Sequence, residues 1–129
     1  MRQMSFSANW PQLLDGSKDV TRRLGWGNLK PGDRIQAVQK GQGLKKGEHV
    51  VTGPVIQCVS NTPERVDCII MEPGRSIGGR SEVAREGFPD KTPEEFVKMF
   101  CKMNNCHHDT IINRIEFYDE SEETYPPIS

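Results

Sequence analysis

The chain has 129 residues, which is enough for one domain with one hydrophobic core. Hydrophobic residues make up 34% of it, and no run approaches the length of a membrane span. The first ten residues, MRQMSFSANW, lack the apolar segment of a signal peptide. We therefore expect a cytoplasmic protein without a membrane-spanning segment, in which the four cysteines stay reduced.

Charge is distributed unevenly along the chain, although its formal net value is only -1. All 17 Lys and Arg lie before residue 116, whereas five of the 18 Asp and Glu lie at or after it. The basic excess is densest in residues 18–48. A local basic field of this kind favours a nucleotide or nucleic acid ligand. From charge alone, a solvated surface of loops explains it equally well.

The first residues predict a short strand followed by a short helix. Residues 3–8 alternate polar and apolar side chains, as a half-buried strand does. Asn9 is expected to cap a helix over 10–14, and Gly16 to end it in the left-handed conformation. Residues 18–21 are then expected to continue as an extended segment.

The next part of the chain predicts a turn, a strand and a basic loop. Pro31-Gly32 is a strong turn signal, and residues 34–39 alternate as a strand. Residues 40–48 contain three glycines and three lysines. They form either a plain hairpin connection or a loop that grips phosphate.

Two apolar segments in the middle of the chain predict further strands. Residues 49–60 are interrupted by Gly53-Pro54, which indicates two short strands or one bulged strand. Residues 65–71 are expected to form another strand. The loop 72–80 is a second candidate wall for a ligand site, because it carries the arginines Arg75 and Arg80.

Two helices and a closing strand are predicted in the C-terminal part. Ser81 and Gly87 are expected to begin and end a short helix. Thr92 and Glu95 form a capping box at the start of a longer helix, with Pro93 at its first position. The expected core-facing stripe of this helix is Phe96, Met99, Phe100 and Met103.

The order of elements predicts the fold class. A closing strand is expected over 110–118, with Ile111, Ile115 and Phe117 on one face. Residues 1–118 are therefore expected to form one domain, and 119–129 a flexible acidic tail. Several short strands with flanking helices indicate an α+β fold, built on a small curled sheet or barrel.

A cysteine and histidine group near the C-terminal helix invites a zinc interpretation. Its spacing argues against zinc, because no C-x-x-C pair exists and adjacent histidines rarely both reach one ion. Buried free thiols beside a polar turn fit better, and we expect neither a metal nor another cofactor. The group consists of Cys101, Cys106, His107 and His108.

The segment 16–23, GSKDVTRR, has the strongest potential for chemistry. A lysine can activate a threonine hydroxyl if desolvation or nearby positive charge lowers its pKa. Lys18 and Thr21 could pair in this way only if the backbone bends between them. Glu86 is a candidate proton carrier for such a pair. The residues alone leave an ordinary alternative open, in which Lys18 is exposed and Thr21 is a plain strand residue.

The same segment resembles the G-x-K-x-x-[E/T]-x-R signature of the ASCH domain, a member of the PUA-like superfamily. The marked positions are Gly16, Lys18, Thr21 and Arg23, and the later L-K-P-G-D at 29–33 is also common in the family. The resemblance covers nearly all of the chain before residue 119. It implies a curled mixed β-barrel with short flanking helices and a ligand cleft between barrel and helices.

Threonine at position 21, where many members have Glu, is similar to small bacterial ASCH proteins that act as N4-acetylcytidine amidohydrolases. The resemblance implies a catalytic set of Lys18, Thr21 and Glu86, with Glu82 as the alternative to Glu86. The expected substrate is a modified nucleoside or base whose linear amide is hydrolysed. The residues expected to bind it are Arg22, Arg23, Trp26, Arg75 and Arg80.

Two other functions remain open at this level. PUA-like domains often hold RNA or a modified base without chemistry, and the basic body of this chain suits such a binding module. A nuclease ranks lowest, because no acidic cluster is arranged for magnesium. The sequence leaves the oligomeric state undetermined.

Overall fold

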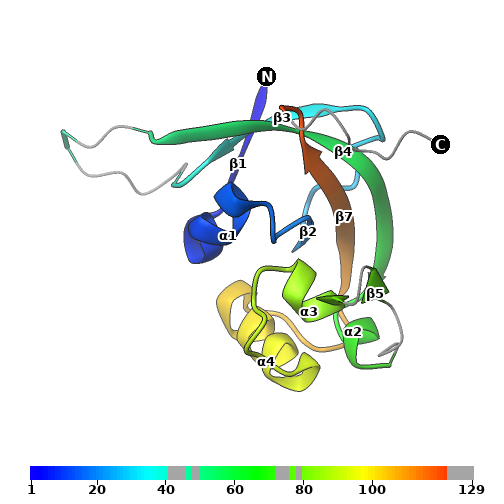
Figure 1. Ribbon diagram of the computed structural model, residues 1–129. Helices are drawn as coiled ribbons and strands as arrows, with labels where there is room; N and C mark the ends of the chain where they lie inside the picture. The colour runs from blue at the N-terminus through cyan, green and yellow to red at the C-terminus, as the bar shows by residue number, and fades with distance from the viewer. Residues whose placement is uncertain (41–45, 48–49, 72–75, 78–79, 122–129) are drawn as a thin grey trace.

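The protein is built on one five-stranded mixed sheet, as the computed structural model in Figure 1 shows. The structure describes residues 1–40, 46–47, 50–71, 76–77 and 80–121, with only the backbone given for 76, 77 and 80. The sheet curls into a half-barrel, with β1 and β3 parallel and all other neighbours antiparallel. In spatial order its strands are β1 (Arg2–Ser5), β3 (Arg34–Val38), β4 (Thr52–Arg65), β7 (Ile111–Asp119) and β2 (Val20–Arg23).

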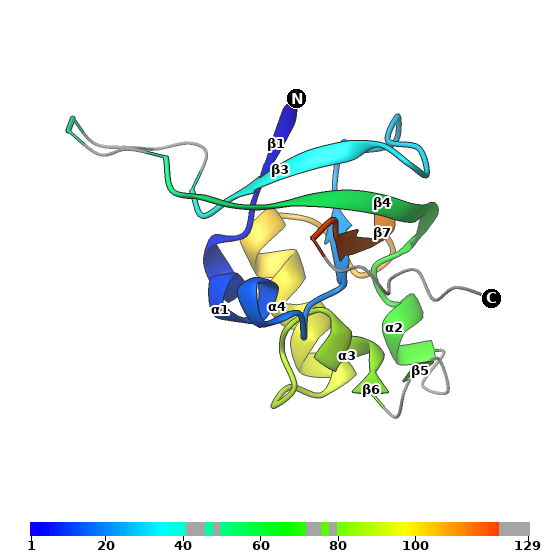
Figure 2. The ribbon, with the colours of Figure 1, turned by 45° about the horizontal axis from the view of Figure 1, so that its top comes forward.

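Short helices cover one side of this sheet, and Figure 2 shows them as a second layer beneath β3 and β4. The expectation of an α+β fold with a curled sheet and short flanking helices is therefore confirmed. A two-stranded hairpin, β5 (Ser76–Ile77) with β6 (Arg80–Ser81), precedes α3. The helical segments are a 3₁₀ turn at Ser7–Asn9, α1 (Trp10–Asp15), α2 (Cys68–Met71), α3 (Glu82–Arg85) and α4 (Pro93–Asn104).

The long strand β4 bends the sheet. Gly53 and Pro54 do not end it, so the alternative of one bulged strand is confirmed over the alternative of two short strands. The pairing of β3 with β4 changes register between Gln36 and Val38. At this irregularity the Gln36 side chain donates a 2.8 Å hydrogen bond to the Gly53 carbonyl. Bulges of this kind increase the local twist, which is what a curling sheet requires.

The strand predicted over residues 65–71 is wrong. Only Arg65 belongs to a strand, as the last residue of β4, and Cys68–Met71 form α2. The backbone N–H of Val66 and of Asp67 still bond to the segment before β7, but Ile70 N then donates to Asp67 O. The helical turn buries Ile69 against α4 and the elements near it. A short apolar run fits a strand or a buried helical turn equally well, so packing decided this segment.

Local capping signals placed the helix ends correctly in most cases. Thr92 and Glu95 form the predicted capping box, and Ser81 accepts a hydrogen bond from Ala84 N. Gly16 has φ of +83° and ends α1 as predicted. Asn9 is an exception, because its side chain makes no capping bond. It is buried instead, and its amide donates a 2.7 Å hydrogen bond to the Glu86 carbonyl.

Two apolar clusters form the core, and β7 contributes to both. Ile115 and Phe117 pack with residues of β1, β3, β4 and α1, whereas Ile112 packs with α2, α3 and α4. The predicted single apolar face of this strand is thus only partly right, because Ile111 is 60% exposed. The predicted α4 stripe fails similarly at Met103, which is 63% exposed. Both residues lie at the ends of their elements, where the packing partners stop.

The C-terminal boundary of the sheet lies slightly beyond the predicted domain end. β7 includes Asp119, and Glu120 N donates to the Val55 carbonyl. The Glu120 carboxylate also accepts two hydrogen bonds from Arg34, at 2.7 and 2.9 Å. The first residues assigned to the tail therefore belong to the folded sheet. Residues 122–129 lie outside the described residues.

Candidate functional site

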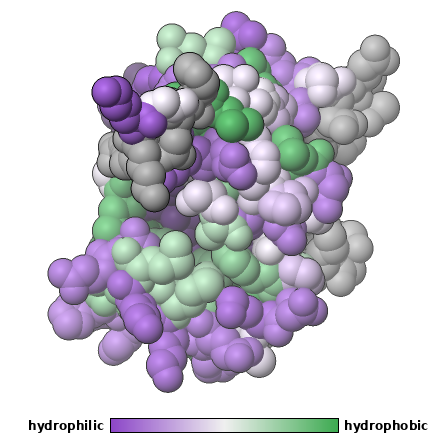
Figure 3. Space-filling view, turned by 90° about the vertical axis from the view of Figure 1, so that its left-hand side faces the viewer, coloured by the Kyte–Doolittle hydropathy of each residue, from purple (hydrophilic) through white to green (hydrophobic). Residues whose placement is uncertain are grey.

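A cleft of about 220 Å³ lies between the edge of the sheet and helix α4. Figure 3 views this side of the molecule, where a hydrophobic area borders a hollow with hydrophilic residues inside it. One wall is polar and comes from β2, the segment before it and the end of α3. The other wall is apolar. The polar wall includes Lys18, Thr21, Arg23 and Glu86, and the apolar wall includes Phe88, Phe96, Met99, Phe100 and Met103.

Lys18 reaches the cleft from the bent connection between α1 and β2. Gly16 turns the chain there, and Lys18 N then donates to Gln12 O at 3.0 Å. Lys18 lies before the strand begins at Val20. Its side chain therefore does not follow the alternation of side chains between the two faces of a strand. Lys18 and Thr21 therefore line the same cleft, which is the bent geometry that their pairing requires.

The Lys18 ammonium is buried and surrounded by oxygen acceptors. Its Nζ donates to the Val20 carbonyl at 2.7 Å, the Glu86 carbonyl at 2.8 Å and Glu86 Oε1 at 3.2 Å. Burial lowers the pKa of Lys18 to about 8, although the negative charge of Glu86 works in the opposite direction. A group with this pKa can lose its proton under mildly alkaline conditions, which an exposed lysine cannot do.

Thr21 lies on β2 and is 3% exposed. Its Oγ1 accepts a 3.0 Å hydrogen bond from Arg23 Nε. Among the described residues, no hydrogen bond joins Lys18 Nζ to Thr21 Oγ1. Arg23 also donates from Nη2 to the Ser5 carbonyl at 2.5 Å, and so links the two edge strands of the half-barrel, β2 and β1.

Glu86 is the carboxylate that meets Lys18. It caps the C-terminal end of α3, and its two oxygens divide between Lys18 and Arg22, whose Nη1 lies 2.8 Å from Oε2. Glu82, the alternative, accepts hydrogen bonds from Arg22 and Arg114 instead. Burial raises the pKa of Glu82, but the hydrogen bonds and charges of Arg114 and Arg22 outweigh burial and lower this pKa to about 2.

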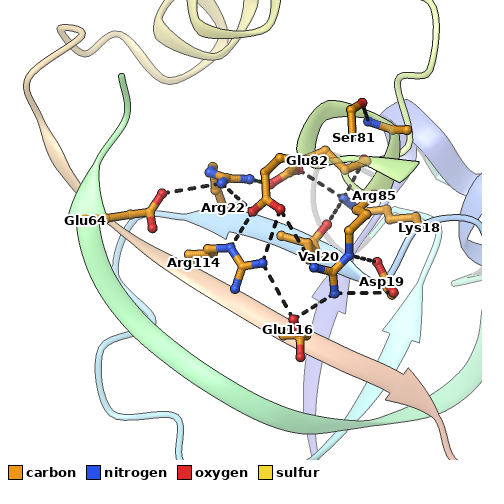
Figure 4. Close-up of polar contacts among 12 residues, drawn as sticks. Lys18, Asp19, Val20, Arg22, Glu64, Ser81, Glu82, Arg85, Arg114 and Glu116 are labelled. Carbon is orange, nitrogen blue, oxygen red and sulfur yellow. Dashed lines mark hydrogen bonds and ion pairs between the residues drawn. The ribbon is translucent and has the colours of Figure 1, made fainter. Parts of the chain in front are cut away.

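Glu82 belongs to a larger ion network between α3, β2, β4 and β7, which Figure 4 shows, and Glu86 joins it through Arg22. Arg22 has a fully buried side chain, and its terminal nitrogens contact Glu64, Glu82 and Glu86. Sequence reasoning expected Arg22 to bind substrate. Arg22 does line the cleft, and its guanidinium also has three carboxylate partners. The network also contains Arg85, which pairs with Asp19 and Glu116, and Arg114, which pairs with Glu82 and Glu116.

Sequence reasoning missed Arg85, Arg114 and two of their partners, Asp19 and Glu116. One available signal was the spacing of Glu82, Arg85 and Glu86 at i, i+3 and i+4, which places three charges on one face of a short helix. The charges on alternate positions of β7, at Arg114 and Glu116, were a second signal. Both patterns are usual on solvated surfaces, so neither indicated burial by itself.

The remaining predicted ligand residues lie elsewhere. Trp26 does not line the cleft but a neighbouring hollow, and the Arg2 guanidinium lies 4.1 Å from the centre of its ring. Arg75 lies outside the described residues, as does the side chain of Arg80. The described part of the basic loop 40–48 is limited to Lys40, Lys46 and Gly47.

The cysteine and histidine group lies away from the cleft. Cys101 and Cys106 are free thiols packed against the second apolar cluster, and His108 Nδ1 lies 3.1 Å from Asp67 Oδ2. Within the described ranges, no group of three or more His, Cys, Asp and Glu side chains is arranged to hold a metal ion.

Comparisons with protein-family models, curated proteins and solved structures found no match for this chain. No helix in the described part of the chain is long and apolar enough to cross a membrane.

Proposed function

We propose that the chain is an ASCH domain of PUA-like fold that removes an acyl group from the N4 amine of a cytosine nucleoside or base. The signature residues support this proposal, because Lys18, Thr21 and Arg23 line one cleft between the curled sheet and the helices. Gly16 supplies the left-handed turn that brings Lys18 there. The position of the cleft, between the sheet and the helices, is the one that the resemblance implies.

One observation carries the enzymatic proposal. Lys18 is buried, its pKa is lowered to about 8, it contacts Glu86, and it shares its cleft with Thr21. A neutral lysine is a competent general base, and a carboxylate beside it can carry the proton onward.

The proposed reaction begins with Lys18 in its neutral form. Nζ moves from the Val20 carbonyl towards Thr21 Oγ1 and takes the hydroxyl proton. Thr21 then attacks the acyl carbonyl of the substrate. The hydrogen bond from Arg23 Nε to Oγ1 favours the ionised hydroxyl before the attack. When Oγ1 bonds to the acyl carbon, the Nε–H group of Arg23 stabilises the negative oxygen that forms there.

Collapse of this intermediate breaks the bond between the acyl carbon and N4. Glu86 takes a proton from Lys18 and delivers it to N4, so that the cytosine amine leaves neutral and Lys18 is neutral again. The acyl group remains on Thr21 as an ester. Lys18 then takes a proton from water, and the resulting hydroxide attacks the ester. As the carboxylic acid leaves, Lys18 returns the proton to Thr21 Oγ1, so that both residues are restored.

The dimensions of the cleft agree with a small planar ligand. Its volume of about 220 Å³ lies below the roughly 300–1,000 Å³ of sites for drug-sized molecules, so a nucleobase with a short acyl group fits better than a large ligand. The apolar wall offers aromatic and methionine side chains to the faces of a pyrimidine ring.

The test is incubation of the purified protein with N4-acetylcytidine, followed by chromatography for cytidine. We expect turnover in the wild type and in Thr52→Val, an exposed threonine of β4. Thr21→Val should abolish it, and Lys18→Met should lower kcat by about 10²–10⁴-fold. The rate should rise with pH and level off above about 8, because only neutral lysine accepts the proton. Equal rates in Thr21→Val and the wild type would exclude Thr21 as nucleophile.

A second function, recognition of a modified base or RNA without chemistry, is favoured by two hydrogen-bonding details. Lys18 Nζ donates to three acceptors, and Thr21 Oγ1 bonds to Arg23 rather than to Lys18. Folded protein that binds N4-acetylcytidine or RNA, with affinity falling steeply as salt rises, but never produces cytidine would support this function over the first.

A further inference from the structure

A second hollow of about 610 Å³ adjoins the cleft. The two share Ser5, Ser7 and Arg23 in their linings, so a single ligand can extend from one into the other. The second hollow lies along β1 and the ends of β2 and β3. Its other lining residues are Gln3, Met4, Trp26, Val38 and Lys40.

The charged residues that line this hollow, among those the structure describes, are positive. They are Arg23 and Lys40, and no carboxylate of the described residues lines it. Arg2 adds a third positive charge beside it, where its guanidinium covers the ring of Trp26. Cations that converge without a neighbouring acid attract an anionic group.

Arg23 retains a nitrogen for such a group. Its Nε donates to Thr21 and its Nη2 donates to Ser5, which holds the guanidinium rigidly between the cleft and the hollow. Nη1 makes no hydrogen bond to any described residue. Lys40 is exposed and lines the same hollow. A rigid arginine and a flexible lysine are a common combination for binding phosphate.

We propose that this hollow binds a phosphate of the substrate, so that the preferred substrate is a cytosine nucleotide or a nucleic acid strand rather than a free nucleoside. The inference rests on the proposed function, because that function places the base in the adjoining cleft. Phosphate is the anionic group that a nucleoside gains when it becomes a nucleotide. With the base in the smaller cleft, the ribose and its phosphate extend past Arg23 towards Lys40.

The activity experiment compares N4-acetylcytidine with its 5′-monophosphate at low salt. We expect kcat/KM to be about tenfold higher for the monophosphate, as one charge-assisted contact provides, and this ratio to shrink as salt is added. Lys40→Gln should bring the ratio close to one. Lys30→Gln, an exposed lysine that lines neither hollow, should keep the wild-type ratio.

A third substrate distinguishes the two sources of the phosphate. A trinucleotide with N4-acetylcytidine at its centre should match or exceed the monophosphate if a strand is the substrate. A lower kcat/KM for the trinucleotide identifies the mononucleotide instead. Two results would overturn the phosphate site. One is equal kcat/KM for the monophosphate and the nucleoside in the wild type, and the other is a kcat/KM ratio that Lys40→Gln leaves unchanged.

A binding experiment separates failure of this site from failure of the proposed function. Dissociation constants of cytidine and cytidine 5′-monophosphate are measured by titration calorimetry for the wild type, Lys40→Gln and Lys30→Gln. Tighter binding of the monophosphate that depends on Lys40 supports the site even when no acyl group is hydrolysed. Equal affinities in an active enzyme refute the site and leave the proposed function intact.

Discussion

The buried Lys18 ammonium should make the stability of this protein rise between about pH 8 and 10.5. Lysine has an ordinary pKa of 10.5, and burial lowers that of Lys18 to about 8 in the folded protein. Between these two pH values the unfolded chain binds more protons at this position than the folded chain. The free energy of unfolding therefore increases with pH in this range, and the contribution is constant below and above it.

The size of the effect follows from the same two values. A difference between 10.5 and about 8 corresponds to about 3 kcal/mol, at about 1.4 kcal/mol for each pH unit. This is a large fraction of the roughly 5–15 kcal/mol that stabilises a typical domain. Full burial of Lys18, at 3% exposure, means that solvent does not screen the effect.

Urea unfolding of the wild type and Lys18→Met, measured from pH 7 to 10.5, isolates this contribution. Loss of the hydrogen bonds of Lys18 changes the free energy of unfolding by the same amount at every pH. The ionisation of Lys18, in contrast, makes the difference in this free energy between the wild type and Lys18→Met change with pH. Lys98→Met, which removes an exposed ammonium from α4, corrects for the general loss of one positive charge. A difference that stays flat or falls across this range would refute the conclusion that Lys18 is desolvated.

Three further predictions concern the surroundings of the cleft. Arg22→Leu should lower the free energy of unfolding by about 3–5 kcal/mol in urea, because it leaves buried carboxylates unpaired. Its control is Arg34→Leu, which removes an exposed ion pair and should lower the same free energy by no more than about 1 kcal/mol. Glu82→Gln should remove part of the stability that the wild type loses as pH falls from 4.5 towards 2, measured by acid unfolding. Gly87→Ala should cost more than Gly32→Ala in thermal unfolding, because both have positive φ but only at Gly87 does an added Cβ meet Asn9, at 3.0 Å.

Each of these predictions has an outcome that contradicts it. Equal costs for Arg22→Leu and Arg34→Leu would mean that the buried network contributes no more than a surface ion pair. Acid unfolding curves of Glu82→Gln and the wild type that run parallel would show that Glu82 does not ionise differently on folding. Equal losses of thermal stability in the two glycine variants would mean that position 87 requires glycine only for its positive φ. Packing against Asn9 would then make no contribution.

Features controlled by neighbouring residues could be predicted from the sequence. The capping box of Thr92 and Glu95, the cap at Ser81 and the left-handed Gly16 all occur where the local pattern indicated. Each of these interactions spans at most four residues, so the sequence contains the whole physical cause. The left-handed turn at Gly16 is also what brings Lys18 to the same cleft as Thr21.

Features that depend on distant partners were predicted poorly. Asn9 was expected to cap α1, yet its amide bonds to Glu86, 77 residues away. Residues 68–71 satisfy the pattern of a strand but pack as a helical turn against α4. In both cases the local preference is worth little, and a long-range hydrogen bond or apolar contact outweighs it.

The segment 16–23 shows the division between sequence and tertiary structure most clearly. The sequence by itself determined that a lysine, a threonine and two arginines follow a turn at Gly16. Only the tertiary structure decided their environments: Glu86 rather than Glu82 meets Lys18, and Arg22 joins a buried ion network, whereas Arg23 donates to Thr21 and Ser5. The physical reason is that charge and pKa depend on burial and on partners 60 or more residues away in the chain, which no local pattern encodes.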